Sequence, residues 1–262
     1  MIAASWPRAN PGEERLLHID PASCTFRDAR VRELPTLLRA GDLLVLNDAA
    51  TLPASLRGTS RSGAAVELRL ISRAASGEWT ALIFGAGDWR TRTEDRELSP
   101  QLSWEGERSE EIGFRGGLSA RVRKTTSRLV EVTFDREGAA FWSALYRAGK
   151  HVQYAYIERP LAAWHVQTAY ASRPWAAEMP SAGRPLTWGV LLDLTRRGIR
   201  LGAITHAAGL SSTGEASLDA ALPLAERFDV PAAPVALVNE TKSSGGRVVA
   251  TGTTVVRALE GA

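Results

Sequence analysis

The C-terminal segment Gly245–Glu260 limits the possible folds more than any other part of the chain. Two glycines precede a short apolar run, Arg247–Ala250, and a second apolar run with helical spacing begins after Gly252-Thr253-Thr254. This pattern predicts a strand that leads into a helix through a polar turn. Free N–H groups at the start of such a helix, together with the threonine hydroxyls, form a seat for an anion or a polar ligand. Arg257 lies one turn further on and would reach this seat. Alternatively, the threonines only cap the helix and Arg257 faces solvent.

A second predicted strand also ends in polar residues. A helix is expected over Val31–Arg39, followed by a fully buried strand over Asp42–Asn47, which ends in the pair Asn47-Asp48. Polar residues at the end of a buried strand are site candidates in an α/β fold. Asn and Asp are equally common as turn formers, so both interpretations stay open.

A third predicted strand, Ile199–Thr205, delivers His206 at its carboxyl end. Helices are expected before it, over Thr187–Arg197, and after it, over Pro231–Ser243. Ligands in open α/β folds gather beyond the carboxyl ends of strands, so we expect His206 and the turn Thr251–Thr254 to face one cleft. The alternative is a histidine with a purely structural role.

The stretch between Leu56 and Asp135 has a different pattern. Apolar and polar residues alternate over three short segments, Val66–Leu70, Leu118–Val122 and Leu129–Phe134, and Trp79–Phe84 is also strand-like. Glycines separate these segments. Closely spaced short strands without helices between them predict a small barrel or sandwich. We therefore predict an α/β fold in which a barrel-like α/β domain, formed by residues 1–55 and 136–262, is interrupted by a small antiparallel β-barrel domain over residues 56–135.

Helical spacing returns over Glu137–Ala148, where an aromatic stripe indicates a core-facing helix rather than a surface for stacking bases. A long stretch without regular spacing, Lys150–Arg184, follows. Such a stretch in a compact protein usually has a function. Its polar residues Gln167, Thr168 and Tyr170 are of the kind that bind a flat ligand or a nucleotide, although each of them also suits packing.

Composition excludes several classes of protein. The chain has no apolar run of membrane-spanning length and no signal-peptide pattern, which predicts a soluble, cytoplasmic protein that does not bind membranes. We also expect a monomer. Cys24 is the only cysteine and no Cys/His cluster occurs, so no metal site is expected. The net charge is only +3, but the basic residues are almost all arginines, which permits a nucleic-acid partner without requiring one.

A series of motifs occurs in one order along most of the chain. They are the block Glu33–Asp48, Leu52-Pro-Ala54, Val66-Glu-Leu68, Tyr156-Ile157 with Arg159-Pro160, Gln167-Thr-Ala-Tyr-Ala171, Met179-Pro-Ser-Ala-Gly183, Glu226-Arg-Phe-Asp-Val-Pro231 and Gly246–Glu260, together with Thr187 and His206. In these motifs the sequence resembles the S-adenosylmethionine:tRNA ribosyltransferase-isomerases of queuosine biosynthesis. The last block is the most specific.

The resemblance implies an α/β domain interrupted by a β-barrel domain, in agreement with the pattern above. It also implies a reaction in which S-adenosylmethionine, the co-substrate, donates its ribosyl group to a 7-aminomethyl-7-deazaguanine base in the anticodon stem-loop of tRNA. Adenine and methionine leave, and the ribose is rebuilt as an epoxycyclopentanediol.

Such a reaction requires a base, a proton donor for adenine and groups that hold the ribose and the methionine carboxylate. On the matching motifs, we expect His206 and Glu226 to serve as base or proton carrier, and Arg257 to form an anion clamp with Thr253 and Thr254. The expected substrate-binding residues are Asn47, Asp48, Gln167, Thr168, Tyr170, Ser181, Gly183, Gly252, Thr253 and Thr254.

The sequence departs from the family pattern at several motifs. Pro185 replaces a family histidine, Leu222-Pro-Leu-Ala-Glu226 replaces a His-x-His-Ser-Glu motif, and Asn47-Asp-Ala-Ala50 and His206–Ser212 are altered versions of two others. The family also continues beyond the position where this chain stops, so we expect a divergent member that lacks the usual C-terminal segment. Two alternatives therefore stay open: an enzyme that cleaves S-adenosylmethionine or transfers from it to another acceptor, and a non-catalytic RNA-binding relative.

Overall fold

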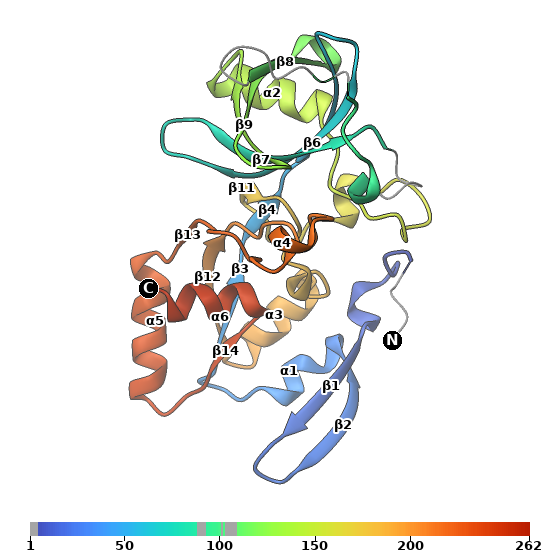
Figure 1. Cartoon of the computed structure of the whole chain (residues 1–262). Coiled ribbons are helices and arrows are strands. Elements are labelled where there is room, and N and C mark those ends of the chain that lie inside the picture. The colour runs from blue at the N-terminus through green and yellow to red at the C-terminus, as the bar shows by residue number, and fades with distance from the viewer. Residues whose placement is uncertain (1–4, 88–92, 101, 103–108) are drawn as a thin grey trace.

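The computed structural model describes residues 5–87, 93–100, 102 and 109–262. Figure 1 shows a β-barrel at the top of the molecule, an α/β layer structure below it, and an N-terminal hairpin that projects at the bottom. The α/β fold with a small antiparallel barrel is thus confirmed.

The lower part is built on a four-stranded sheet in the order β13 (Phe228–Asp229), β12 (Arg200–His206), β3 (Leu43–Asn47) and β14 (Val248–Ala250). The strands β12 and β14 are parallel to β3, and β13 is antiparallel to β12. All three parallel strands therefore end at the same edge of an open sheet, and this edge faces the barrel (Figure 1).

Helices cover both faces of this sheet, which explains why β3 is apolar at nearly every position. Leu44 and Leu46 pack with α1 (Leu34–Leu37) and α3 (Trp188–Arg196). Leu43 and Val45 point the other way, toward α5 (Ala232–Ser243) and α6 (Thr253–Glu260). Because alternate residues enter two different cores, the strand has no polar face.

The upper part is a closed antiparallel barrel in the order β10-β7-β6-β5-β8-β9. Its strands are β5 (Ser55–Ser60), β6 (Ala65–Arg73), β7 (Trp79–Gly85), β8 (Ser109–Phe114), β9 (Ser119–Lys124) and β10 (Leu129–Phe134). Helix α2 (Gly138–Ala148) packs against it, and Phe141 and Leu145 belong to the same buried cluster as the barrel interior. The division into domains at residues 56 and 135 stays a prediction.

A short parallel pair, β4 (Ala49–Thr51) with β11 (Arg173–Ala176), lies between the barrel and the sheet. The prediction that Lys150–Arg184 has no regular structure is wrong for β11. This strand contains Pro174 and has no alternating pattern, so only its partner β4 reveals it.

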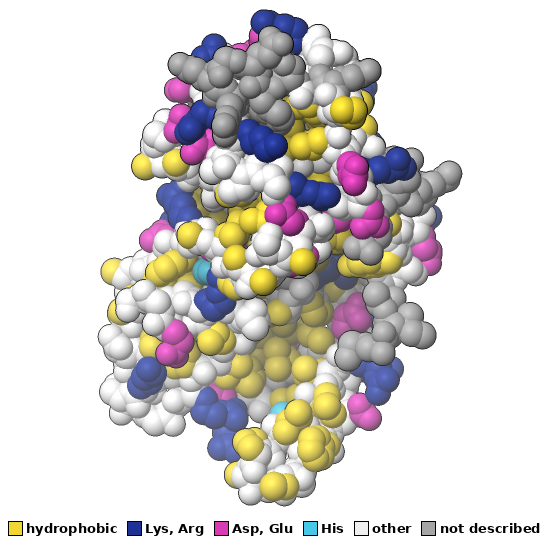
Figure 2. Space-filling model, viewed as in Figure 1, with side chains coloured by type: hydrophobic (Ala, Val, Ile, Leu, Met, Phe, Trp, Pro, Cys, Tyr) yellow, Lys and Arg dark blue, Asp and Glu magenta, His cyan; other side chains and the backbone are white. Residues whose placement is uncertain are grey.

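The N-terminal hairpin consists of β1 (Arg15–Asp20) and β2 (Thr25–Arg30). It carries the exposed side chains Leu17, Ile19 and Phe26, which gather at the bottom of Figure 2. Above the hairpin, basic and acidic side chains are interspersed on the face that the figure shows. Within the described residues, no helix has the length and apolar character needed to cross a membrane.

The remaining predicted elements match the structure, with one correction. The helix expected over Val31–Arg39 is a 3-10 turn, Val31–Glu33, followed by the single turn α1, and Leu38 is already extended. In contrast, α3 begins after the capping residue Thr187, whose hydroxyl accepts from the Val190 N–H, and the chain leaves the helix through Gly198 at φ 77°. The other short elements are α4 (Ala216–Asp219) and 3-10 turns at Pro11–Glu13, Thr93–Asp95, Arg115–Gly117, Ala163–His165 and Ser181–Gly183.

Candidate functional site

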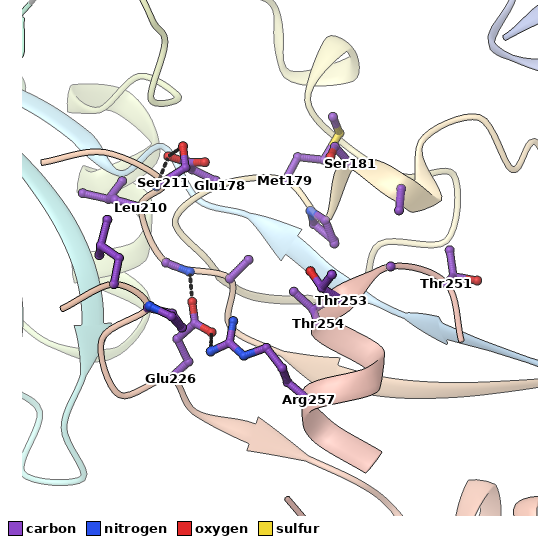
Figure 3. A pocket seen from close by; sticks show the side chains of 17 residues that line it. Glu178, Met179, Ser181, Leu210, Ser211, Glu226, Thr251, Thr253, Thr254 and Arg257 are labelled. Carbon is purple, nitrogen blue, oxygen red and sulfur yellow. Dashed lines mark hydrogen bonds and ion pairs between the residues drawn. The ribbon is translucent and has the colours of Figure 1, made fainter. Parts of the chain in front are cut away.

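A pocket of about 370 Å³ opens where β12 and β14 end, and we call it the strand-tip pocket (Figure 3). This volume lies within the range of roughly 300–1,000 Å³ that is common for small-molecule sites. The lining comes from four segments that are far apart in sequence: Glu178–Ala182; Ala208–Ser211; Leu222, Pro223 and Glu226; and Thr251–Thr254 with Arg257. The predicted position of the site, beyond the carboxyl ends of parallel strands, therefore agrees with the structure.

The turn before α6 forms one wall of the strand-tip pocket. Gly252 is the N-cap of the helix at φ 83°, and a Cβ at this position would lie 2.8 Å from the Ala182 Cβ. Only glycine adopts this positive φ and leaves room for Ala182 without strain. No side chain caps the helix start. The N–H groups of Thr253 and Thr254 lie at the pocket wall. Because they belong to the first turn of α6, the helix itself offers them no carbonyl acceptor.

Glu226 connects the other predicted catalytic residues. Its carboxylate accepts a hydrogen bond from the Gly209 N–H at 2.6 Å and forms an ion pair with Arg257 (Figure 3). It also lies 3.6 Å from the His206 Nε2. Arg257 therefore does not simply face solvent, since it closes the pocket wall together with Glu226. Because the two charges pair, the expected anion clamp carries no excess positive charge.

His206 lies behind the pocket wall rather than in it. The residue is buried, it stacks on Phe228 with ring centroids 6.3 Å apart, and it reaches the pocket through Glu226. Burial lowers the pKa of His206, with Arg257 acting in the same direction and Glu226 opposing it, so the imidazole is neutral at pH 7. Its Nδ1 has no hydrogen-bond partner among the described residues.

Asn47 ties the three strand ends together. Its side-chain oxygen accepts from the His206 N–H at 2.9 Å, and its amide nitrogen donates to the His206 carbonyl at 3.0 Å and to the Thr254 hydroxyl at 3.1 Å. Asp48 accepts from the hydroxyls of Thr205 and Ser172 instead. Neither residue lines the strand-tip pocket, so Asn47 positions the pocket wall and Asp48 joins β12 to the segment before β11.

The candidates from the long connecting stretch also divide into two groups. Ser181 lines the pocket. Gln167 is bonded in both directions to the backbone of Thr51, and Thr168 is buried. Gly183 makes room for Tyr170, because a Cβ there would lie 2.0 Å from the tyrosine oxygen. These last four residues support the pocket segment from behind.

Glu178 is the lining residue that sequence reasoning missed. One of its carboxylate oxygens accepts hydrogen bonds from the Tyr154 hydroxyl and from the Ser211 N–H, the latter at 3.0 Å. Burial and the adjacent carboxylate raise the pKa of Tyr154, so the hydroxyl remains a donor. No Lys, Arg or His within the described residues forms an ion pair with Glu178. The only local signal is its place directly before the motif Met179–Gly183.

The charges around the strand-tip pocket sum to −1, since Glu226 and Arg257 pair and Glu178 is left over. The pocket thus offers a carboxylate for a cation and helix-start N–H groups for an anion, with Met179, Leu210 and Leu222 as an apolar wall. In the described part of the chain, no group of three or more His, Cys, Asp or Glu residues is arranged to hold a metal ion. The prediction that the protein binds no metal is not tested by this arrangement.

The fold is that of an α/β protein with a pocket at the tips of its parallel strands. The chain belongs to the family described as "Queuosine biosynthesis protein", whose sequence model matches residues 1–262. This confirms the resemblance found in the motifs.

Relatives and a solved structure carry related names. The S-adenosylmethionine:tRNA ribosyltransferase-isomerase of Parvibaculum lavamentivorans is 35% identical over 261 residues, covering 95% of this chain and 69% of that protein. The protein of the same name from Thiobacillus denitrificans is 34% identical, covering 100% of this chain and 72% of its own length. The crystal structure of S-adenosylmethionine tRNA ribosyltransferase from Thermotoga maritima matches 98% of this chain and 68% of that one, with 22% identity and a TM-score of 0.42.

Proposed function

We propose that this protein is a transferase that moves and isomerises the ribosyl group of S-adenosylmethionine onto a 7-aminomethyl-7-deazaguanine base in tRNA. Family membership supports the enzyme class. The observation that supports this assignment of the site is the charge pattern of the strand-tip pocket, which is lined both by Glu178, a carboxylate without an ion-pair partner among the described residues, and by the start of a helix. S-adenosylmethionine has a sulfonium, an ammonium and a carboxylate, and therefore needs both kinds of partner in one site.

In this proposal the adenine ring lies against the apolar wall, and the methionine carboxylate accepts from the N–H groups of Thr253 and Thr254. Glu178 contacts the cationic end of the co-substrate. The acceptor amine forms a bond to the 5′ carbon, the ribose is rebuilt, and adenine and methionine leave. Glu226 lines the pocket next to Arg257, so it is the carboxylate placed to accept a proton, and the buried, neutral His206 lies 3.6 Å behind it.

We also propose that the acceptor is the anticodon stem-loop and that the protein acts in the cytoplasm as a monomer. The high arginine content is compatible with an RNA partner. On the face shown in Figure 2, acidic and basic side chains are mixed, so RNA binding would depend on particular contacts rather than on a broad basic surface.

One observation supports a second candidate, an enzyme that cleaves S-adenosylmethionine for a different acceptor. Leu222, at a position where the family has a histidine, lines the strand-tip pocket and makes that wall apolar. Pro185, which replaces another family histidine, does not line it.

The test is incubation of the protein with S-adenosylmethionine and tRNA that carries the aminomethyl-deazaguanine, followed by mass analysis of the nucleosides. We expect a product nucleoside that has gained the rebuilt ribosyl group, and adenine release that depends on the tRNA. Release of adenine without tRNA would favour the second candidate. Absence of S-adenosylmethionine binding in calorimetry would leave the non-catalytic RNA-binding relative.

A matched pair of variants tests the site itself. Glu226→Gln retains an acceptor for the Gly209 N–H but removes the charge, so we expect kcat to fall by roughly 100-fold or more, as for loss of a general base. Glu240→Gln, on the exposed side of α5, removes a charge of the same sign and should leave kcat unchanged. Equal rates for both variants would remove Glu226 from the mechanism.

A further inference from the structure

A second, smaller pocket of about 90 Å³ lies between the barrel and the sheet. Its walls carry three indole rings and two guanidinium groups from separate elements, and we call it the tryptophan pocket. The residues that matter are Trp79 from β7, Trp142 from α2, Trp175 from β11, Arg73, Ala207 and Arg227. Trp79 is almost completely buried and meets Trp142 edge-to-face at 6.3 Å, so this wall is held by the barrel core.

Arg227 stacks on Trp175, with its guanidinium carbon 3.6 Å from the ring centroid. Arg173 lies near the same ring but pairs with Asp229. Arg227 has no acidic partner among the described residues, and its side chain is exposed. A guanidinium on an indole face, with its N–H groups unpaired, is well suited to bind a phosphate beside a stacked ring.

The tryptophan pocket and the strand-tip pocket share their dividing wall. Ala207 lines the first pocket and Ala208, the next residue, lines the second. On the other chain segment, Trp175 lines the first and Glu178 lines the second. The two segments are joined, because the Ala177 N–H donates to the Ala208 carbonyl at 2.8 Å. Because Ala207 and Ala208 are consecutive, their Cα atoms are about 3.8 Å apart, so the two pockets adjoin one another.

We propose that the tryptophan pocket binds one unpaired base of the RNA substrate, next to the base that is modified, and that Arg227 contacts its phosphate. This inference rests on the proposed function, since it requires an RNA acceptor. Indole faces and stacked guanidinium groups are the usual partners of bases splayed out of single-stranded loops. A small space with flat walls admits one ring system and excludes a duplex. The site separates recognition of the RNA from binding of S-adenosylmethionine.

The experiment uses the full chain and a fluorescently labelled anticodon stem-loop RNA that carries the aminomethyl-deazaguanine. Anisotropy at one fixed salt concentration gives the Kd for RNA, and calorimetry gives the Kd for S-adenosylmethionine. Trp175→Ala should weaken RNA binding by roughly 5- to 150-fold, the effect of losing one base stack. Trp175→Phe should retain most of the affinity. The control Trp188→Ala removes an indole that is 59% exposed on α3 and should change nothing. The Kd for S-adenosylmethionine should stay the same in all three variants.

A series of RNAs, each without one base of the loop, identifies the occupant. Removal of one base should weaken binding to the unchanged protein by the same factor as Trp175→Ala and have no further effect on that variant. As a second variant that does not disturb the core, Arg227→Met should weaken binding and lower the slope of log Kd against log salt by about one.

Four results would overturn the inference. If Trp175→Ala binds RNA as tightly as the unchanged protein, or if no single missing base matters, no base occupies the pocket, although the proposed function stands. If Trp175→Phe loses affinity for S-adenosylmethionine, the ring has a structural role. If the unchanged protein binds S-adenosylmethionine but no RNA, the proposed function fails and this inference fails with it.

Discussion

Glu178 provides the most direct test of how the strand-tip pocket recognises its ligand. The substitution Glu178→Gln keeps the shape of the side chain and an oxygen that accepts from the Tyr154 hydroxyl and the Ser211 N–H, so the fold should persist. It removes one negative charge. Because Glu226 and Arg257 already pair, the charge of the pocket changes from −1 to zero.

The size of the effect follows from the surroundings of Glu178. A cation 4–6 Å from the carboxylate gains roughly 3–4 kcal/mol at an effective dielectric constant of 20. Removal of water from both groups cancels part of this gain, and contacts to charged groups typically contribute about 1.5–3 kcal/mol. The Kd for S-adenosylmethionine should therefore rise roughly 10- to 150-fold in the variant.

Calorimetry with two ligands identifies which cation Glu178 contacts. S-adenosylhomocysteine has the ammonium of S-adenosylmethionine but a neutral thioether in place of the sulfonium. If Glu178 contacts the sulfonium, only S-adenosylmethionine loses affinity, and if it contacts the ammonium, both ligands lose affinity equally. Glu260→Gln, exposed on α6 outside the pocket, is the control. An unchanged Kd for S-adenosylmethionine in Glu178→Gln, or an equal loss in the control, would refute the reasoning.

Two further substitutions test the sheet and the turn that forms the pocket wall. Hydrogen bonds from Arg247 lower the pKa of buried Asp42 from 3.8 to about 2, so its ionised form stabilises the fold above pH 4 and this stabilisation is lost as the pH falls toward 2. Asp42→Asn should lower the free energy of unfolding, measured in urea, by about 1–2 kcal/mol at pH 7, a value reduced because its partner Arg247 is half-exposed. The loss should be clearly smaller at pH 3, and equal losses at both pH values would contradict this. Gly252→Ala should lower the free energy of unfolding by about 1 kcal/mol and also weaken S-adenosylmethionine binding, because the new Cβ would contact Ala182 in the pocket wall. Gly63→Ala is the control: Gly63 has φ 85° and open space around it, so this substitution should lower stability alone. Equal ligand affinity in the two glycine variants, measured by calorimetry, would show that the turn is not part of the site.

Elements whose sequence pattern reflects their own surroundings were predictable. The buried strand β3 has a continuous apolar sequence because helices cover both of its faces, and the sequences of β6, β9 and β10 alternate between apolar and polar residues. The turn at Gly252 was predictable for the same reason, since its glycine and threonines mark the strand-to-helix transition locally.

Contacts between distant segments were not predictable from local patterns. The strand β11 exists because β4 pairs with it, and no periodicity records that pairing. Glu178 acquires its place in the pocket from a tyrosine 24 residues earlier and a serine 33 residues later. His206 was expected in the cleft, but its neighbour Glu226 occupies that position, because Asn47 holds the end of β12 from behind.

The pairing of Arg257 with Glu226 changes the meaning of the most informative segment of the sequence. Taken alone, a helix start followed one turn later by an arginine favours an anion such as phosphate. In the folded chain Glu226 neutralises the arginine, and Glu178 adds a carboxylate across the pocket, so a polyanion would be repelled where a zwitterion would be bound. Phosphate groups of an RNA substrate are therefore expected outside the strand-tip pocket. The exposed guanidinium of Arg227 at the adjoining tryptophan pocket, which forms no ion pair with any residue that the structure describes, is placed to receive one.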